Sequence, residues 1–572
     1  MSDFIYRGRD EETALDRLER AGLIAVDMET VSLNDYTSIG IGIYYADNEG
    51  IYFPIFPEPS EHLPLALWKT SHPDVTKIYH NGIGFDLEVL KRYGEAEGFA
   101  PPDDVNYEDT SIMAQVHGLP AGLQRLGEEW LGYDDLFSIQ DLLKEYGAKD
   151  MLGVPFERTA TKCLNDCRTT WAMYHYLKGR ISDRQRDCYE VDRRLVHVLR
   201  QLEGRGLALR AGLLEDYRTK LSRDLIDIKR QCSVEGFDPG SPLQVGFVLA
   251  SRGNTLPFTD RSHKRLKTDE ETLETIDDPL AKVILDYRGK AKTLSSYVEP
   301  WMGKERAYTH FRLDLATGRL ASGRYNTWDS RNRNLQNVPP GLREVFRPDS
   351  GVWSWADHGQ IELRVLAYMS KDRAMMAEYY KDQLGEKPDL HRATMEAARV
   401  YVPAFTRDAG KTFNFARVFG AGDRQLSRKT GVPIDAVPMV RAAMASIFPE
   451  SGVWIDKKMK GAQDVDYEET IFGRRCRLPE MREDADVNPR AFAAHRSKCA
   501  VNYPVQGSAA DIVKRGMLKV YDSGVDLRLQ VHDEYLVDGD WLEPGMYVDH
   551  ELAWIHPELN TPFEVKKGII WS

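Results

Sequence analysis

Four acidic residues in the first third of the chain have a spacing that suits metal binding. Asp27 and Glu29 stand two apart in Val26-Asp27-Met28-Glu29-Thr30, and in a strand that spacing places both side chains on one face. Such a pair is unfavourable unless a cation or a proton compensates its charge. Asp86, at the expected start of a helix, and Asp166 could complete the group. Any one of them alone is more often a surface acid, but the set predicts a site for divalent metal.

A second set of acidic residues lies in the C-terminal half. Asp357 ends a strand-like run, and Asp533 stands with Glu534 at the turn of an alternating segment, 527–537. Alone, an acid at a strand end is more often a turn or cap residue. Two such acids from remote strands would supply the oxygen ligands that Mg²⁺ prefers while leaving room for substrate phosphates. The pair predicts a second metal site.

Between these two acids lies a segment with a cationic and aromatic stripe. Arg407, Lys411, Phe415 and Phe419 recur every fourth residue, so they share one face of a helix that Gly420 would end. Two cations followed by two aromatics could bind a triphosphate and stack a base. For the segment in isolation, the favoured interpretation is an amphipathic helix with its aromatics in the core and its cations in water.

The surrounding pattern indicates which elements position these residues. Short β-branched runs predict neighbouring strands, followed by helical periodicity, which together indicate an α/β domain of roughly 180 residues. The strands are expected at 22–26 and 39–45, and the helices at 84–93, 123–131 and 160–178. Long amphipathic helices are expected at 188–233 and 270–300, and mixed strands and helices follow from residue 301.

Composition excludes several classes of protein. With 572 residues, three to four domains are expected. The chain is 42% hydrophobic and 29% charged, as in ordinary globular proteins. No apolar run approaches the length of a membrane helix, and the first twenty residues are too acidic for a signal peptide. Six cysteines form no CxxC pair, which argues against a disulfide framework or a zinc site. We therefore expect a soluble intracellular protein in the cytoplasm.

Charge is distributed unevenly along the chain. The formal net charge is -13, yet residues 1–180 hold 16 Lys+Arg against 31 Asp+Glu, whereas residues 181–340 hold 28 against 23. Binding of a polyanion depends on local cation density rather than on the total. The middle segment is therefore where a polyanion is expected to bind.

Taken together, these residues resemble the family A DNA polymerases, the bacterial polymerase I type. Asp357-His358-Gly359-Gln360-Ile361-Glu362-Leu363-Arg364 matches the first palm motif, with His358 and Gly359 replacing the usual Tyr and Ser. The segment 407–420 matches the fingers helix, and Val531-His532-Asp533-Glu534 matches the second palm motif. Further matching segments are Thr317-Gly318-Arg319-Leu320, His391-Arg392-Ala393-Thr394 and Asn502-Tyr503-Pro504-Val505-Gln506-Gly507. The order is that of the family over roughly residues 190–572.

The resemblance implies template-directed DNA synthesis from dNTPs with two Mg²⁺ ions per active site, for which Mn²⁺ could substitute. Asp357 and Asp533 would bind them, with Glu534 nearby. The nucleotide-binding residues implied are Arg407, Lys411, His391, Phe415, Phe419, Glu362 and Gln360. Among these, Lys411 would act as general acid and Glu362 would exclude a 2′-hydroxyl. The implied DNA contacts are Arg319, Asn502, Gln506, His532, Arg288 and Lys292. Where the family usually has Tyr this chain has Phe419, so sugar selection is expected to be looser.

The N-terminal acids resemble those of the DEDD 3′–5′ proofreading exonucleases. Asp27, Glu29, Asp86 and Asp166 would then hold two Mg²⁺ ions. The position four residues before the last Asp is normally Tyr or His, but here it is Lys162. A lysine there is expected to contact the phosphate or to point to solvent.

The fold class implied is multidomain α/β and α+β, with an RNase H-like exonuclease domain followed by a right-hand polymerase domain. The expected limits are exonuclease 1–182, thumb 183–300, palm 301–370 and 490–572, and fingers 371–489. The layout leaves no room for a 5′-nuclease before the exonuclease and resembles phage replicative polymerases, which would place the protein in the host cytoplasm. The stretch from Gly323 to Arg333 is longer than the family norm and has no assigned role.

Two alternatives remain open. A single-subunit RNA polymerase shares the palm carboxylates but lacks an appended proofreading domain and the acid corresponding to Glu362. A DNA-binding accessory subunit with one or both sites inactive is disfavoured, because all the expected carboxylates are present. The expected partners are primer-template DNA and dNTPs, and they could include a helicase or primase, a single-strand binding protein or a processivity factor, with no membrane.

Overall fold

The computed structural model describes residues 4–5, 10–32, 35–97, 106–259, 265–323, 332–384, 386–481, 488–541 and 559–571. Most of the stretch from Gly323 to Arg333 therefore lies outside the described residues. The chain divides into two compact units, each assembled from segments that are remote in sequence. The first unit comprises Met1–Gln201, Phe311–Ser330 and Lys460–Leu518, and the second comprises Leu202–His310, Arg331–Met459 and Lys519–Ser572.

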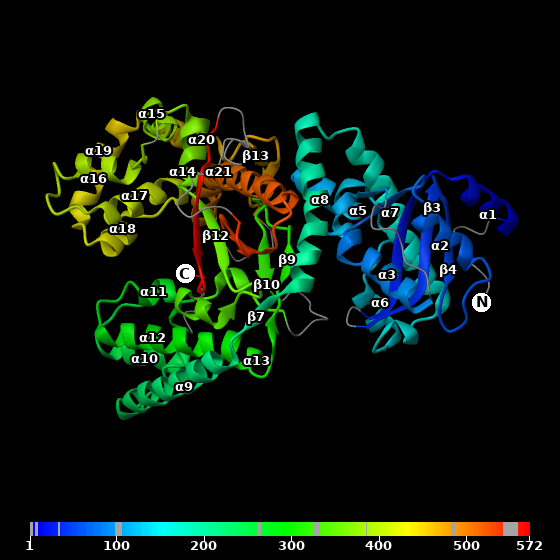
Figure 1. The fold of residues 1–572 in the computed structure, drawn as a ribbon, viewed down its shortest axis with the longest axis horizontal. Coiled ribbons are helices and arrows are strands. Elements are labelled where there is room, and N and C mark those ends of the chain that lie inside the picture. The colour runs from blue at the N-terminus through cyan, green and yellow to red at the C-terminus, as the bar shows by residue number, and fades with distance from the viewer. Residues whose placement is uncertain are drawn as a thin grey trace. The chain divides into compact units, whose positions relative to one another are not determined.

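The first unit is built on a six-stranded mixed sheet, seen in Figure 1. Its order is β1 (Phe4–Ile5), β4 (Glu49–Pro54), β3 (Asp35–Ala46), β2 (Leu23–Ser32), β5 (Thr76–Tyr79) and β6 (Tyr107–Asp109). The first four strands pair antiparallel, and β5 and β6 continue the sheet in parallel. The expected adjacent strands at 22–26 and 39–45 are thus confirmed as β2 and β3. Both run further than expected into polar sequence.

Helices complete the first unit. They are α1 (Glu11–Arg20), α2 (Leu63–Ser71), α3 (Asp86–Glu97), α4 (Thr110–Val116), α5 (Leu123–Trp130), α6 (Ile139–Tyr146), α7 (Phe156–Lys178) and all but the last four residues of α8 (Asp183–Arg205) and of α21 (Pro489–Asp522). The long α7 packs against β2, β3, β4 and β5, and its buried side chains join those of the strands in one core. The helices expected at 84–93, 123–131 and 160–178 are confirmed as α3, α5 and α7, with shifted ends.

A buried charge network ties α8 and α21 to the hairpin of β13 (Tyr467–Glu469) and β14 (Arg475–Arg477) in the first unit. The Arg474 guanidinium lies 2.8 Å from Asp192 and 2.7 Å from Asp511. The Lys514 ammonium is 2.9 Å from Asp192. All four side chains are almost fully buried. Because two acids and two bases balance, the network is stable as a set and costly to break by removing one member.

The second unit contains a four-stranded antiparallel sheet in the order β15 (Leu527–Val531), β16 (Glu534–Asp538), β12 (Trp353–His358) and β17 (Phe563–Gly568). A smaller sheet joins β11 (Phe346–Arg347), β7 (Leu207–Leu209) and β8 (Arg306–Ala307). Five of the six residues of β12 are buried, including the polar Ser354 and His358, and only Asp357 is partly exposed. It is an inner strand of the sheet, between β16 and β17.

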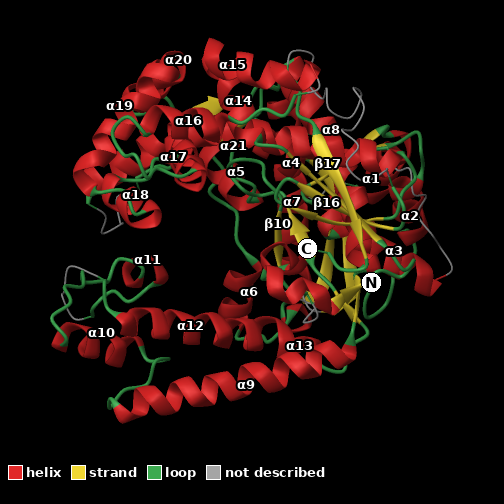
Figure 2. Ribbon diagram, turned by 60° about the vertical axis from the view of Figure 1, so that its left-hand side comes forward, coloured by secondary structure: helices red, strands yellow, loops and turns green. Residues whose placement is uncertain are grey.

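Two groups of helices accompany this sheet. The first is α9 (Ala211–Val234), α10 (Pro242–Ser251), α11 (Glu270–Leu273), α12 (Pro279–Thr293) and α13 (Glu299–Trp301). The second is α14 (Ile361–Ser370), α15 (Arg373–Tyr380), α16 (Leu390–Ala398), α17 (Arg407–Phe419), α18 (Asp423–Thr430), α19 (Val437–Ile447) and α20 (Pro449–Gly461). The helices α9 and α12 lie side by side in Figure 2 and pack against each other.

The two long helices expected from the sequence are shorter and interrupted. The segment 188–233 breaks at β7, after Gly206 adopts a left-handed φ of 57°. The segment 270–300 divides because Asp278 caps a new helix that begins at Pro279, where proline is favoured at the first position. No helix in the described part of the chain is long and apolar enough to cross a membrane.

Replacing Arg474 by Met should strongly destabilise the first unit, since it leaves Asp192 and Asp511 buried with less compensating charge. We expect a loss of about 3–5 kcal/mol in the free energy of unfolding, measured by urea denaturation. Arg20→Met removes an exposed pair with Asp16 and should change it by about 1 kcal/mol at most. Equal effects of the two variants would contradict this account of the network.

Two candidate metal sites

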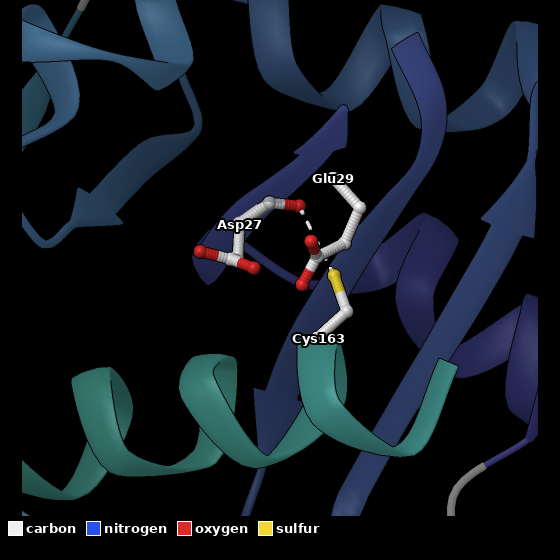
Figure 3. Close-up of side chains that lie close together, drawn as sticks. All are labelled: Asp27, Glu29 and Cys163. Carbon is white, nitrogen blue, oxygen red and sulfur yellow. Dashed lines mark hydrogen bonds between the residues drawn. The ribbon is translucent and has the colours of Figure 1, made fainter. Parts of the chain in front are cut away.

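The predicted carboxylate pair of the first unit lies on β2. Asp27 pairs in register with Gly42, and Glu29 with Gly40, on β3. A side chain at Gly42 would come within 2.6 Å of Cys163 Sγ, so this glycine lets α7 approach the sheet closely. Asp27, Glu29 and Cys163 consequently lie together, as Figure 3 shows, with candidate ligand atoms within 4.8 Å of one another.

The other two predicted acids reach the same place from two helices. Asp86 is the first residue of α3, and its Oδ1 accepts a hydrogen bond of 2.8 Å from the Met28 N–H, between the two acids of β2. Asp166 lies on α7 and is connected to Glu29 through one shared cation, described next. The fold thus brings together all four acids that the sequence singled out, and metal binding by them stays a prediction.

The shared cation is Lys162. Its Nζ donates to Glu29 Oε1 at 2.9 Å and to Asp166 Oδ2 at 2.8 Å. The residue is only 7% exposed, so the expectation that it could point to solvent is wrong. A contact with phosphate stays a prediction. Its direction could not be read from the sequence, because one partner lies four residues away and the other lies 133 residues away on β2.

Burial sets the protonation behaviour of this cluster. It raises the pKa of Asp27 and of Asp86 well above the ordinary value, and raises that of Glu29 despite the attraction of Lys162. Burial also opposes the charge of Lys162, but Asp166, Glu29 and Asp27 outweigh it and raise its pKa. Ionisation of these carboxyl groups is therefore unfavourable unless positive charge lies close to them. The Oδ2 atom of Asp27 is buried and accepts no hydrogen bond from the described residues, and this oxygen-rich donor set fits a divalent cation.

In the second unit, the palm-like acids meet at adjoining strands. Asp357 on β12 pairs directly with Glu534 on β16, and the hairpin between β15 and β16 carries Asp533. The His358 N–H donates to the Asp533 carbonyl at 3.2 Å. The two predicted metal-binding acids are therefore neighbours in space although 176 positions separate them, from 357 to 533.

Three residues that the sequence did not single out, Lys566, Trp571 and Arg343, contact Asp357 or the neighbouring Glu534. Lys566 on β17 places its Nζ 3.3 Å from Asp357 Oδ1. The Trp571 indole donates to Glu534 Oε1 at 2.8 Å, and Arg343 is 3.7 Å from the same oxygen. Burial raises the pKa of Glu534, and the Trp571 hydrogen bond partly offsets this effect. The alternating run 563–568 could have indicated a strand in the sequence, but not that this strand pairs with β12.

The cationic and aromatic stripe lies on the exposed face of α17. Arg407 and Lys411 are exposed, Phe415 is half-buried and Phe419 is 38% exposed. The two aromatic rings have centroids 6.2 Å apart. The core-facing aromatic is instead Phe413, so the interpretation that favoured buried stripe aromatics is wrong, while its exposed cations are confirmed.

The helix α16 supports this stripe through a close backbone contact. A Cβ atom at Gly410 would lie 2.6 Å from the His391 carbonyl oxygen, so only glycine lets α16 and α17 approach this closely. The side chain of Asn414 donates to His391 Nδ1 at 3.0 Å, and Thr394 donates to Asn414 Oδ1 at 2.9 Å. With Nδ1 accepting, the imidazole proton lies on Nε2. Burial and the nearby Arg407 lower the pKa of His391 to about 4, which makes it a neutral donor at pH 7.

The remaining residues that the sequence predicts to bind the nucleotide, Glu362 and Gln360, lie on or beside α14, which packs against α17. Glu362 is 7% exposed in the first turn of α14. Gln360 precedes the helix in a left-handed conformation, and its Oε1 accepts from the Tyr379 hydroxyl at 3.2 Å. His358 is buried between the Thr561 carbonyl and the Tyr535 hydroxyl, and burial lowers its pKa to about 4.

Comparison with known proteins decides the family. The family model for DNA polymerase family A matches residues 212–565, and that for a 3′-5′ exonuclease matches residues 4–182. The chain belongs to DNA polymerase family A. The fold class expected from the sequence, an exonuclease domain followed by a family A polymerase domain, is confirmed.

Curated relatives of this family span nearly the whole chain. DNA polymerase I of Chloroflexus aurantiacus is 29% identical over 96% of this chain and 61% of its own length. That of Pseudomonas aeruginosa is 27% identical over 97% of this chain and 64% of its own length. The chain therefore spans less than two thirds of these relatives. The POL domain of Pol1 from M. smegmatis, solved with DNA primer-template and dNTP, shares the fold, with a TM-score of 0.70 at 21% identity over 99% of this chain and 98% of that one.

The predicted DNA-contacting residues of this family A chain fall in both units. The first unit holds Arg319, in a loop, and Asn502 and Gln506 on α21, all half-buried. The second unit holds the exposed His532 at the hairpin turn, and Arg288 and Lys292 on α12. Arg288 donates to the carbonyls of Pro239 and Thr268, which gives it a structural role. Lys292 is exposed. Their DNA contacts and the domain limits stay predictions.

The raised pKa of Asp86 makes the stability of the metal-free protein depend on pH. The folded state binds a proton that the unfolded state releases, so the free energy of unfolding falls as pH rises above the ordinary carboxyl range. Asp86→Asn keeps an acceptor for the Met28 N–H and carries no charge.

We expect Asp86→Asn in EDTA at pH 8 to raise Tm by roughly 3 °C, equivalent to about 1 kcal/mol. The gain should shrink as pH falls and vanish below about pH 3, where the acid is protonated in both states. The exposed Asp74→Asn is the control and should show neither effect. A lower Tm for Asp86→Asn at pH 8 would contradict the assignment.

Proposed function

We propose that this protein is a DNA-directed DNA polymerase that also removes nucleotides from the primer 3′ end. The observation that carries the proposal is the presence of two separate carboxylate clusters in one family A chain, each within a single unit. The curated relatives bear the name DNA polymerase I. An RNA polymerase is disfavoured by the exonuclease match and by Glu362, and an inactive accessory subunit by the intact carboxylates.

For synthesis, Asp357 and Asp533 would hold two Mg²⁺ ions, with Mn²⁺ able to substitute, because adjoining strands present them as oxygen donors. Bound by these two acids, such ions would activate the primer 3′-hydroxyl and neutralise the departing pyrophosphate. Lys566, 3.3 Å from Asp357, would release that acid when a metal binds. Trp571 holds Glu534 in a fixed orientation beside them.

For nucleotide binding, the exposed stripe of α17 presents charge and ring surface in the required order. Arg407 and Lys411 would bind the triphosphate, and Lys411 would deliver a proton to the pyrophosphate as general acid. His391 would add a neutral Nε2–H donor. Phe415 and Phe419 would flank the base, and buried Glu362 would close the pocket against a 2′-hydroxyl. Because α14 packs against α17, these groups lie on neighbouring helices of one unit.

For proofreading, Asp27, Glu29, Asp86 and Asp166 would bind divalent metal and place the scissile phosphate. The buried, unpartnered Oδ2 of Asp27 supports this assignment. A replicative, phage-like role, cooperation with helicase, primase, single-strand binding protein or processivity factor, and a cytoplasmic location stay predictions.

Separate sites predict separable activities. Asp357→Asn should lower primer extension by several powers of ten, as for other catalytic metal ligands, and leave primer degradation intact. Asp27→Asn should do the reverse. One gel assay of a labelled primer-template, with and without dNTPs, measures both.

The exposed Asp74→Asn, whose side chain is 92% exposed, is the matched control and should change neither activity. If either active-site variant lost both activities while remaining folded, the two-site proposal would fail.

Sugar selection tests the orientation of α17. In this family a Tyr at the position of Phe415 accepts dideoxynucleotides, because its hydroxyl replaces the hydrogen bond of the missing 3′-hydroxyl. Phe415→Tyr should therefore raise dideoxynucleotide incorporation sharply, measured as the ddNTP/dNTP ratio on a primer. Phe419→Tyr should leave that ratio unchanged and lower ribonucleotide incorporation. An unchanged ratio for Phe415→Tyr would show that the stripe is misassigned.

A further inference from the structure

We propose that Lys162 replaces one of the two cations expected at the exonuclease site, so that this site binds a single divalent ion, held by Asp27 and Glu29. The inference rests on the proposed exonuclease function and concerns its metal stoichiometry. It departs from the two ions per site that the family resemblance implies.

The position of the ammonium group carries the proposal. Lys162 Nζ lies within hydrogen-bond distance of carboxylates from two different elements, Glu29 on β2 and Asp166 on α7. A divalent ion that bridged these two acids would need the same space. The lysine side chain is only 9% exposed and the Glu29 side chain 3%, so this pair is inside the protein rather than a surface ion pair.

Charge arithmetic favours one ion over two. The four acids carry four negative charges when ionised, and the Lys162 ammonium supplies one positive charge. One divalent ion would then leave a net charge of −1, whereas a second would make the site positive and would approach the ammonium closely. Because Coulomb repulsion is strong in a buried site, the second ion is disfavoured as long as Lys162 remains between Glu29 and Asp166.

The remaining donors indicate where the single ion binds. Asp27 Oδ2 is buried and accepts no hydrogen bond within the described chain, and a ligand oxygen of Asp27 lies within 4.8 Å of one from Glu29. Lys162 contacts Oε1 of Glu29. An ammonium has three N–H donors, of which the two acids take two, so the third could contact a phosphate oxygen of the DNA.

Counting bound Mn²⁺ ions tests the proposal without measuring activity. The full-length chain with Asp357→Asn and Asp533→Asn serves as the background, which removes the polymerase ligands. Electron paramagnetic resonance of free Mn²⁺ gives the number of ions bound per chain. The same background with Asp27→Asn and Glu29→Gln gives the number bound elsewhere, and the difference is the occupancy of the exonuclease site.

For this difference we expect one ion in the background chain, one with Lys162→Arg, which keeps the charge, and two with Lys162→Met. A difference of two ions in the background chain would overturn the proposal, as would a difference of zero. A single ion in a folded Lys162→Met chain would also overturn it. If Lys162→Met fails to fold, as judged by circular dichroism, the background count alone decides between one ion and two.

Primer degradation by the chain with Lys162 separates this inference from the proposed function. Degradation with two bound ions would leave the exonuclease function standing and overturn the stoichiometry. One bound ion without degradation would support the stoichiometry and count against the function.

Discussion

Repulsion between carboxylates held close together is the constraint on which both candidate sites depend. In the first unit, burial raises the pKa values of Asp27, Glu29 and Asp86, and repulsion from neighbouring acids adds to this effect. In the second unit, Asp357 is partly exposed and is balanced by a lysine from the neighbouring strand. In both sites a lysine compensates the negative charge of the carboxylates. It is the buried Lys162 in the first unit and the half-exposed Lys566 in the second.

Local periodicity predicted correctly that the candidate residues lie on a strand and on a helix, because it depends on near neighbours in the chain. The spacing of two between Asp27 and Glu29 held on β2, and the spacing of four held along α17. Periodicity could not say which face of α17 is exposed, since that depends on the packing of α16 at Gly410. It also could not give the direction of Lys162, because the ammonium is held by a residue on another element.

The division of the chain into two compact units could not be predicted from local sequence patterns. The first unit takes in Phe311–Ser330 and Lys460–Leu518, segments far from its sheet in sequence. The contacts that close it, such as Arg474 with Asp192 and Asp511, pair residues that no spacing rule connects. The breaks in the two long helices were likewise missed, because the amphipathic pattern continues through them. One break is the buried three-residue strand β7, and the other is the new helix start at Pro279, which Asp278 caps. The family resemblance supplied the order of the domains, which the fold and the family comparison confirm.

The contact at Gly410 has a mechanical consequence. Because the backbones of α16 and α17 approach each other there with no side chain between them, direct backbone contact sets the spacing of the two helices at this point. The contact thereby sets the position of His391 relative to the cations of α17. A phosphate bound there as proposed would meet one preset arrangement of donors from two helices.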